Sequence, residues 1–217
     1  PCYLTSWNFF PHLEHLSRLL HPNKVIIGNA PFAIWQMKYM DGVMSEGLEW
    51  LTDKLQYYVI GQKPLYFLEY NAEDRRIERM FQHAMLFGAG FASYPQTRPS
   101  KDLYDKYIPV LERLYRRRWV FDPDPLKLPS TFKGNLFRSE RGTLIASLIS
   151  DLQRLPGRPA GKATVAVHAR GAEQVKQATL YVPGAPPEPV GFSNKDGEIQ
   201  FDVPGDLPAG VVELSAL

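Results

Sequence analysis

The spacing of hydrophobic residues changes near residue 122 and divides the chain into two parts. In the first part, apolar residues at helical spacing alternate with short, continuous apolar runs, which are typical of strands buried in a parallel sheet. Helices are predicted at 9–20, 48–60, 71–87 and 102–119, and strands at 24–29, 40–44, 63–70 and 88–94. This alternation predicts a parallel sheet with crossover helices. Four strands fit half of an eight-stranded barrel or a small doubly wound sheet.

The second part has short, alternating hydrophobic segments that are separated by turn residues. Six such segments lie at 135–138, 143–149, 164–169, 178–182, 198–203 and 210–215. The sequences Glu140-Arg-Gly142 and Asn194-Lys-Asp-Gly197 are typical of hairpin turns. This pattern predicts an all-β, immunoglobulin-like sandwich of about six or seven strands. We therefore expect two domains, an α/β domain over 1–125 and a β-sandwich over 126–217.

The sandwich is expected to have a structural role, because its loops lack a cluster of aromatic residues with carboxylates or amides. We expect it to pack against the last helix of the first domain through Leu111, Leu114 and Tyr115. The basic run Arg116-Arg117-Arg118 lies among apolar residues of that predicted helix, and we interpret it as a solvated helix face.

Composition limits the classes of function. Apolar residues (44%) and charged residues (22%) are ordinary for a globular protein, and a net charge of +2 gives no reason to expect a nucleic-acid partner. The lone Cys2 cannot form an internal disulfide, and the histidines lack metal-ligand spacing, so neither a metal nor another cofactor is predicted. No apolar stretch reaches the roughly 18 residues of a membrane span. An extracellular or periplasmic location is favoured, and the start of the sequence predicts that the chain begins within a longer protein.

Polar and aromatic residues gather where the four predicted parallel strands end. The carboxyl ends of parallel strands meet at one rim, where α/β folds place their chemistry. Two carboxylates on this rim, Glu46 and Glu69, can divide the acid and base roles of sugar hydrolysis and are the predicted catalytic pair. Aromatic rings with polar edges suit sugar rings. The residues predicted to bind substrate are Asn29, Trp35, Tyr70, Asn71 and Tyr94.

These residues also have structural interpretations. Glu46 can cap the following helix or pair with an arginine, and Asn29 can close a tight turn. Glu69 can form an ion pair, and Trp35 can be a core residue. We interpret Asp41 and the histidines as structural. The sequence has no glycine-rich phosphate loop and no Gly-x-Ser-x-Gly elbow, so nucleotide binding and acyl transfer have no support from motifs.

The order of the motifs resembles a known family. Ile27-Gly-Asn29 is followed by Asp41-Gly-Val-Met-Ser-Glu46, then by Lys63-Pro-Leu-Tyr66 and a helix that leads to a small-residue strand. Over 7–119, this order is similar to the second half of (β/α)8-barrel glycoside hydrolases related to the endo-α-1,4-polygalactosaminidases. The resemblance implies that Glu46 ends the sixth barrel strand and that Asn29 ends the fifth.

The resemblance also implies a fold, namely the C-terminal half of a (β/α)8 barrel followed by the immunoglobulin-like sandwich. Such barrels usually have an earlier strand of the form Asp-Gly-x-x-x-Asp, whose last residue is a catalytic group, and this strand is absent from the sequence. The missing N-terminal half is then a partner, as another chain or as a further segment of the same protein. The trailing sandwich fits, because many barrel glycosidases carry a β domain there.

Two functions follow from these observations. The first is a glycoside hydrolase that cleaves an oligo- or polysaccharide with paired carboxylates, of which Glu46 is one. The alternative is a non-catalytic carbohydrate-binding or assembly protein with the same architecture. A small α/β domain with an unrelated substrate is a third interpretation. The sequence leaves open the sugar, the linkage, and whether the reaction retains or inverts the anomeric configuration.

Overall fold

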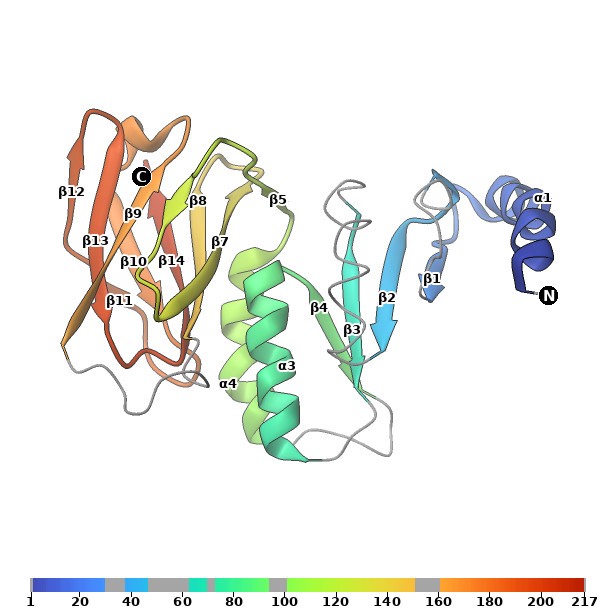
Figure 1. Cartoon of the computed structure of the whole chain (residues 1–217), viewed down its shortest axis with the longest axis horizontal. Helices are drawn as coiled ribbons and strands as arrows, with labels where there is room; N and C mark the ends of the chain where they lie inside the picture. Colours follow the sequence, from blue (N-terminus) through green and yellow to red (C-terminus); the bar gives the residue numbers. More distant parts are fainter. Residues whose placement is uncertain are drawn as a thin grey trace. The chain divides into compact units, whose positions relative to one another are not determined.

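The computed structural model describes residues 2–29, 38–46, 63–69, 73–93, 101–150 and 161–216 (Figure 1). The fold is mixed α/β and divides into two compact units. One comprises Pro1–Ala72 and Gly90–Arg98, and we call it the parallel-sheet unit. The other comprises Glu73–Ala89 and Pro99–Leu217, and we call it the antiparallel-sheet unit. Among the described helices, none is long and apolar enough to cross a membrane.

The parallel-sheet unit contains one long helix and four strands among its described residues. They are α1 (Cys2–Leu20), β1 (Ile27–Asn29), β2 (Gly42–Glu46), β3 (Leu65–Glu69) and β4 (Gly90–Ser93). The strands lie in the order β1-β2-β3-β4, and every neighbouring pair is parallel. This confirms the expected parallel sheet, and each strand overlaps its predicted range. The helix predicted at 48–60 lies outside the described residues.

The two faces of the parallel sheet differ in burial. Residues in register on neighbouring strands share a face, because side chains alternate along each strand. Val43 and Leu65 are in register and both are fully buried, on what we call the covered face. On the other face, which we call the open face, Ile27 is 49% exposed and Tyr66 is 37% exposed. Gly90 is in register with Tyr66, and a Cβ atom there would lie 2.6 Å from the Tyr66 ring, so this close approach requires glycine.

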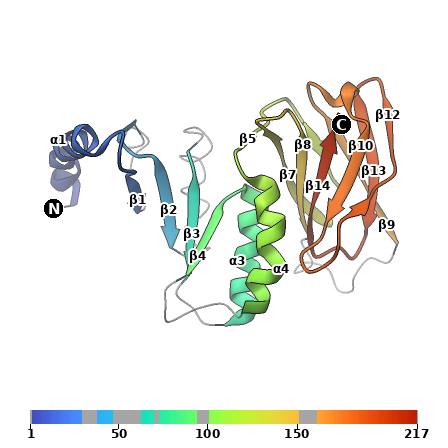
Figure 2. The same ribbon diagram turned by 180° about the vertical axis from the view of Figure 1, so that it is seen from behind.

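The antiparallel-sheet unit combines helices with two sheets (Figure 2). Its helices are α3 (Asp74–Phe87) and α4 (Lys101–Leu111), with short 3-10 turns at Glu112–Leu114 and Ala172–Gln174. One sheet has the strand order β11-β10-β14-β8-β7-β5, and the other has the order β12-β13-β9-β6. The strands are β5 (Arg117–Trp119), β6 (Leu126–Lys127), β7 (Phe132–Ser139), β8 (Leu144–Ser150), β9 (Lys162–His168), β10 (Gln177–Tyr181), β11 (Glu188–Pro189), β12 (Phe192–Lys195), β13 (Glu198–Pro204) and β14 (Ala209–Ser215).

One hydrophobic core unites the two antiparallel sheets. Alternate residues of β9 and β13 contribute to it, including Val165, Val167, Ile199 and Phe201. Residues of β7, β8, β10 and β14 and of the segments between strands also belong to it. Removing these apolar side chains from water is the main favourable contribution to the folding of this unit. The alternating pattern in the sequence is therefore the pattern of burial in this core, which explains why it predicted antiparallel strands correctly.

Strand β8 is buried on both of its faces. One face belongs to the core between the sheets, and the other lies against α3. Ser147 Oγ donates a hydrogen bond to the main-chain oxygen of Met85 at 2.7 Å, and Asn135 Nδ2 donates to that of Leu86 at 2.8 Å. Both carbonyls belong to the last turn of α3, where a helix leaves its carbonyls without internal partners. The six-stranded sheet thus holds the C-terminal end of α3.

The helix predicted over 102–119 ends earlier than expected. Helix α4 ends at Leu111, and Arg116 adopts left-handed backbone geometry with φ 54°. Arg117–Trp119 then form β5, an edge strand that pairs antiparallel with β7, and the Trp119 ring contacts Phe137 with 4.9 Å between centroids. The prediction of a helical basic run was wrong, because strand pairing and this ring contact outweigh the local helical spacing.

The connection after α4 also differs from the expected packing. Leu114 is buried, whereas Tyr115 is 71% exposed, so the predicted packing of Tyr115 was wrong. Arg113 links this segment to the six-stranded sheet instead, with an ion pair to Glu213 at 3.1 Å and its guanidinium 5.0 Å from the centre of the Tyr181 ring. Helices α3 and α4 belong to the same compact unit as β5 to β14. The domain boundary at residue 125 stays a prediction.

Candidate functional site

Three of the predicted site residues end neighbouring strands of the parallel sheet. Asn29 is the last residue of β1, Glu46 of β2 and Glu69 of β3. The structure describes the backbone of these three residues and not their side chains. The other four lie outside the described residues: Trp35, Tyr70, Asn71 and Tyr94. The roles of all seven stay predictions.

Strand register divides the two candidate carboxylates between the faces of the sheet. The register pairs are Asn29 with Met44, Met44 with Tyr66, Glu46 with Leu68, and Glu69 with Ser93. Because Met44 is in register with Tyr66, positions 29, 44 and 46 belong to the open face. Position 69 follows position 68 on the same strand and therefore belongs to the covered face. The backbone thus assigns Asn29 and Glu46 to one face and Glu69 to the other.

The open face combines apolar residues with one carboxylate and one amide. Its described strand positions are Ile27, Asn29, Gly42, Met44, Glu46, Tyr66, Leu68, Gly90 and Ala92. Among these positions, Glu46 is the sole acidic residue. A largely apolar surface with a few polar groups is the usual composition of a small-molecule site. On the covered face beside Glu46, Ser45 is fully buried, and its hydroxyl has no hydrogen-bond partner among the described residues.

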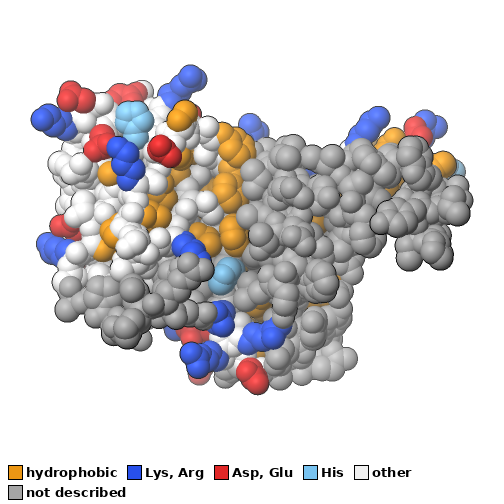
Figure 3. Space-filling view, viewed as in Figure 1, with side chains coloured by type: hydrophobic (Ala, Val, Ile, Leu, Met, Phe, Trp, Pro, Cys, Tyr) orange, Lys and Arg blue, Asp and Glu red, His pale blue; other side chains and the backbone are white. Residues whose placement is uncertain are grey.

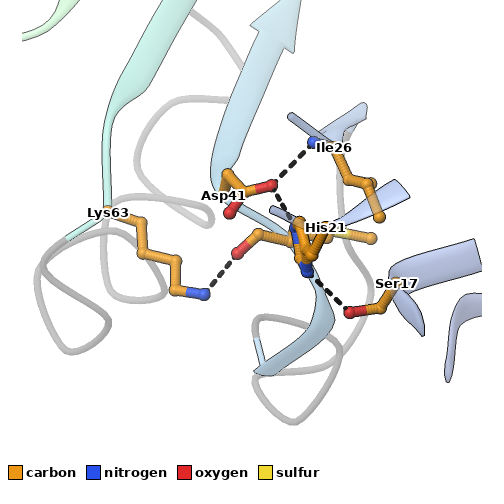
Figure 4. A network of polar contacts seen from close by, with 6 residues as sticks. Ser17, His21, Ile26, Asp41 and Lys63 are labelled. Atoms are coloured by element: carbon orange, nitrogen blue, oxygen red, sulfur yellow. Dashed lines mark hydrogen bonds and ion pairs between the residues drawn. The ribbon is translucent and has the colours of Figure 1, made fainter. Parts of the chain in front are cut away.

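A chain of hydrogen bonds lies at the opposite, amino-terminal ends of the strands (Figure 4). Ser17 Oγ on α1 lies 2.9 Å from His21 Nδ1, and His21 Nε2 lies 2.7 Å from Asp41 Oδ2. The same carboxylate oxygen accepts a hydrogen bond from the Ile26 main-chain N–H at 2.7 Å. The Ile26 hydrogen bond, followed by that of His21, holds the pKa of the Asp41 carboxyl below its ordinary value.

Hydrogen bonds join a serine to a histidine and the histidine to an aspartate, as in an activated serine nucleophile. The position of these residues in the fold nevertheless favours a structural role. Asp41 directly precedes β2 and Ile26 directly precedes β1, so the hydrogen bonds join the end of α1 to the starts of two strands. In parallel α/β folds, chemistry is found at the carboxyl ends of the strands. These contacts agree with the structural interpretation of Asp41 and His21. Sequence reasoning missed the network, although the i, i+4 spacing of Ser17 and His21 could have indicated it.

A second polar network joins α3 to α4 in the antiparallel-sheet unit. Glu78 accepts hydrogen bonds from Lys106 Nζ and from the Tyr107 hydroxyl, the latter at 2.9 Å, and Gln82 Nε2 donates to the same hydroxyl at 3.2 Å. The Tyr107 ring stacks on Phe81 with 5.0 Å between centroids. Tyr107 is 1% exposed, and burial raises its pKa well above the ordinary value. The phenol therefore stays neutral, and the network has a structural role.

The described surface shows no concentration of one sign of charge on the face in Figure 3. On the strand-rich part of this face, Lys and Arg lie beside Asp and Glu. In the part of the chain that the structure describes, no three side chains of His, Cys, Asp or Glu come together to hold a metal ion. The rim of the open face is thus the candidate site that the strand geometry supports best.

Among the comparisons with known proteins, a GH27 structure with a TM-score of 0.51 supports a glycosidase-like fold. No protein-family model matches the chain, and no curated protein matches it. Similar solved structures include the catalytic domain of GH30 xylanase C from Talaromyces cellulolyticus, with 11% identity, a TM-score of 0.49, and coverage of 95% of this chain and 55% of that chain. The GH51 arabinofuranosidase from Xanthomonas axonopodis pv. citri has 11% identity and a TM-score of 0.47, with 94% and 63% covered.

A third similar structure is a GH27 β-L-arabinopyranosidase from Geobacillus stearothermophilus, with 10% identity, a TM-score of 0.51, and coverage of 94% of this chain and 53% of that chain. At such low identity, the likeness concerns the fold and not the activity. The chain spans between 53% and 63% of the length of the three enzymes. The closer relation to the endo-α-1,4-polygalactosaminidases stays a prediction.

Proposed function

We propose that the chain is the C-terminal part of a (β/α)8-barrel glycoside hydrolase, followed by an immunoglobulin-like β-sandwich, and that Glu46 is a catalytic carboxylate. The observation that carries the proposal is the place of positions 29 and 46. Both end adjacent parallel strands, and both belong to the open face. In a closed barrel this face is the interior, and the carboxyl ends of its strands surround the active site.

The exposure of the open face supports the half-barrel interpretation. Ile27 and Tyr66 lie on it and are 49% and 37% exposed, although both are residues that a barrel interior buries. Strand β1 is also an edge of the four-stranded sheet, so its outer side can pair with a further strand. We propose that the missing N-terminal half of the barrel covers the open face and pairs with the free edge of β1. The share of the GH27 enzyme that the chain spans agrees with this.

Glu69 is not the second catalytic group in this proposal. Its position belongs to the covered face, so the sheet separates it from Glu46. The second carboxylate is instead supplied by the missing half, at about 5–9.5 Å from Glu46 as paired-carboxylate glycosidases require. One carboxylate then acts as the acid, and the other acts as the base or nucleophile. Asn29, Trp35, Tyr70, Asn71 and Tyr94 are proposed to bind the substrate, an oligo- or polysaccharide.

The two glutamates offer a matched test in the complete barrel, assayed with a panel of polysaccharides. Glu46→Gln keeps the shape of the side chain and removes its charge, so turnover should fall by about 10²–10⁴-fold while the melting temperature changes little. Glu69→Gln is the control and should leave turnover nearly unchanged. Full turnover in Glu46→Gln with a lowered melting temperature would assign Glu46 a structural role. Loss of turnover in Glu69→Gln alone would reverse the assignment.

A non-catalytic carbohydrate-binding or assembly protein is the second candidate function. One observation favours it, namely that the described strand positions of the open face contain a single acidic residue. Such a protein would bind an oligosaccharide at the rim without releasing products. Calorimetric binding combined with the absence of new reducing ends would distinguish it from the enzyme.

A further inference from the structure

A polar groove follows the edge strand β5 of the six-stranded sheet. It consists of two adjoining cavities of about 820 Å³ and about 740 Å³, which share Arg138, Ser139 and Glu140. The larger cavity lies between the segment after α4 and the β7–β8 turn, and the smaller one extends along β5 towards Asp122. Both volumes fall within the range of about 300–1,000 Å³ that is common for ligand pockets. We call the combined feature the β5 groove.

Arginine side chains line the larger cavity and differ in how firmly they are engaged. Arg113 is paired with Glu213 at 3.1 Å, and Arg138 donates to the main-chain oxygen of Arg170. Arg116 is paired with Glu140 at 3.3 Å, and both of these side chains are more than half exposed. Such an exposed ion pair is weak, so a carboxylate from a ligand can replace Glu140 at little cost.

Arg141 is the second arginine available to a ligand. It lies in the exposed turn between β7 and β8, and no hydrogen bond or ion pair joins it to another of the described residues. The planar guanidinium of arginine binds carboxylates through two parallel hydrogen bonds, which gives geometric specificity as well as charge attraction. The larger cavity therefore offers two accessible guanidinium groups, those of Arg116 and Arg141, to an anion.

Two aromatic rings accompany these charges. Tyr115 lines the larger cavity and is 71% exposed, and Phe121 lines the smaller one and is 62% exposed. The Arg116 guanidinium lies 5.3 Å from the centre of the Tyr115 ring, which orients the arginine against the aromatic side chain. Exposed aromatic rings provide flat apolar surfaces for the apolar faces of sugar rings. Solvent-exposed rings next to accessible arginines are a combination suited to an acidic sugar.

The backbone conformation of Arg116 is also unusual. Its φ of 54° is unusual for a residue with a β-carbon, and such conformations cluster at binding and catalytic sites. This geometry turns the chain from the 3-10 turn at Glu112–Leu114 into β5 and sets Tyr115 and Arg116 side by side at the groove. The unusual backbone geometry is thus located at Arg116, directly after the residue that offers the aromatic ring.

We propose that the β5 groove binds an oligosaccharide that carries carboxylate groups. Arg116 and Arg141 bind the carboxylates, and Tyr115 and Phe121 stack against the sugar rings. The groove belongs to the antiparallel-sheet unit, and its binding goes beyond the proposed hydrolysis, because it does not depend on Glu46 or on a completed barrel. It gives the β-strand part of the chain a binding role, where the sequence had predicted a structural one.

The test is isothermal titration calorimetry of the full chain with tetragalacturonic acid and with its fully methyl-esterified form, which keeps the sugar rings and removes the charges. The acid should bind, and the ester should bind about tenfold or more weakly, because the arginine–carboxylate bonds are lost. Arg116→Ala combined with Arg141→Ala should weaken binding of the acid by a similar factor. Tyr115→Ala should weaken binding of both forms. Arg75→Ala, which removes an exposed arginine of α3 outside the groove, should change neither affinity.

Several outcomes would overturn this proposal. Equal affinity for the acid and its ester would exclude recognition of carboxylates. Sulfate that binds as tightly as the tetrasaccharide would leave an anion site without a sugar site, and no binding by either saccharide would leave no site. Loss of binding in Glu46→Gln would place the ligand at the rim instead of the groove. Retained binding in Glu46→Gln supports the groove whether or not the rim proves catalytic, so failures of the two proposals are distinguishable.

Discussion

Ser147→Ala tests whether the six-stranded sheet holds α3 through hydrogen bonds. The Ser147 side chain is fully buried, and its hydroxyl donates to the main-chain oxygen of Met85 at 2.7 Å. Loss of a buried hydrogen bond costs about 0.5–1.5 kcal/mol net, and about 1–3 kcal/mol when the remaining group has no partner. The Met85 oxygen keeps a hydrogen bond from the Gly88 N–H at 3.2 Å. We therefore expect the free energy of unfolding to fall by about 1 kcal/mol.

Ser139→Ala is the matched control for this substitution. The Ser139 hydroxyl is also buried, but it has no hydrogen-bond partner among the described residues. Its removal should leave stability unchanged or raise it slightly. A buried hydroxyl loses its hydrogen bonds to water on folding, and without a partner it forms no hydrogen bond that offsets this loss. Urea unfolding, monitored by far-UV circular dichroism and tryptophan fluorescence, measures the free energy of unfolding of both variants. For Ser147→Ala we expect the midpoint to fall by about 0.3–0.5 M. Equal destabilisation by the two variants would refute the role of the Met85 hydrogen bond.

Two further predictions concern the parallel-sheet unit. The pKa of Asp41 is lowered in the folded protein, so the stability that its carboxylate provides is present above the ordinary pKa of 3.8 and is lost as pH falls through the lower folded value. Asp41→Asn should therefore lower the melting temperature at pH 6–8 and narrow its difference from the parent below about pH 4; a difference independent of pH would contradict this. Gly90→Ala should lower the melting temperature, because its Cβ would lie 2.6 Å from the Tyr66 ring. Tyr66→Ala should suppress that loss in the double variant, and additive losses would show that the ring is not its cause.

The fold could be predicted where the burial of a segment determines its pattern of apolar residues. Short, mostly apolar segments between the predicted helices identified the four strands of the described parallel sheet, because strands covered by crossover helices need apolar side chains. The pattern of short hydrophobic segments identified six of the antiparallel strands, namely β7, β8, β9, β10, β13 and β14, because residues of each contribute to a shared core. It did not identify the shorter strands β5, β6, β11 and β12. The prediction failed at Arg117–Trp119, where spacing compatible with a helix gave way to pairing with β7 and contact with Phe137. Whether residues 117–119 form a helix or a strand depends on β7, which lies farther along the sequence.

The candidate site was predictable in position but not in arrangement. Strand ends follow from the apolar runs, so the place of Asn29, Glu46 and Glu69 at one rim could be deduced. The face to which each position belongs depends on strand register, and a shift of one residue exchanges the faces. The sequence does not specify register between strands that are joined by long crossovers. It therefore grouped Glu46 with Glu69, whereas the sheet groups Glu46 with Asn29.

The chain crosses between its two compact units more than once. It leaves the parallel-sheet unit to form α3, returns for β4, and leaves again for α4 and all later strands. A single cut in the polypeptide therefore cannot release either unit whole. A protein truncated to begin at residue 126 would lack α3 and would expose Ile145 and Ile149, which are 1% and 5% exposed in the intact chain. A soluble fragment for biochemical work should therefore begin before α3, at the cost of carrying β4 without its neighbouring strand.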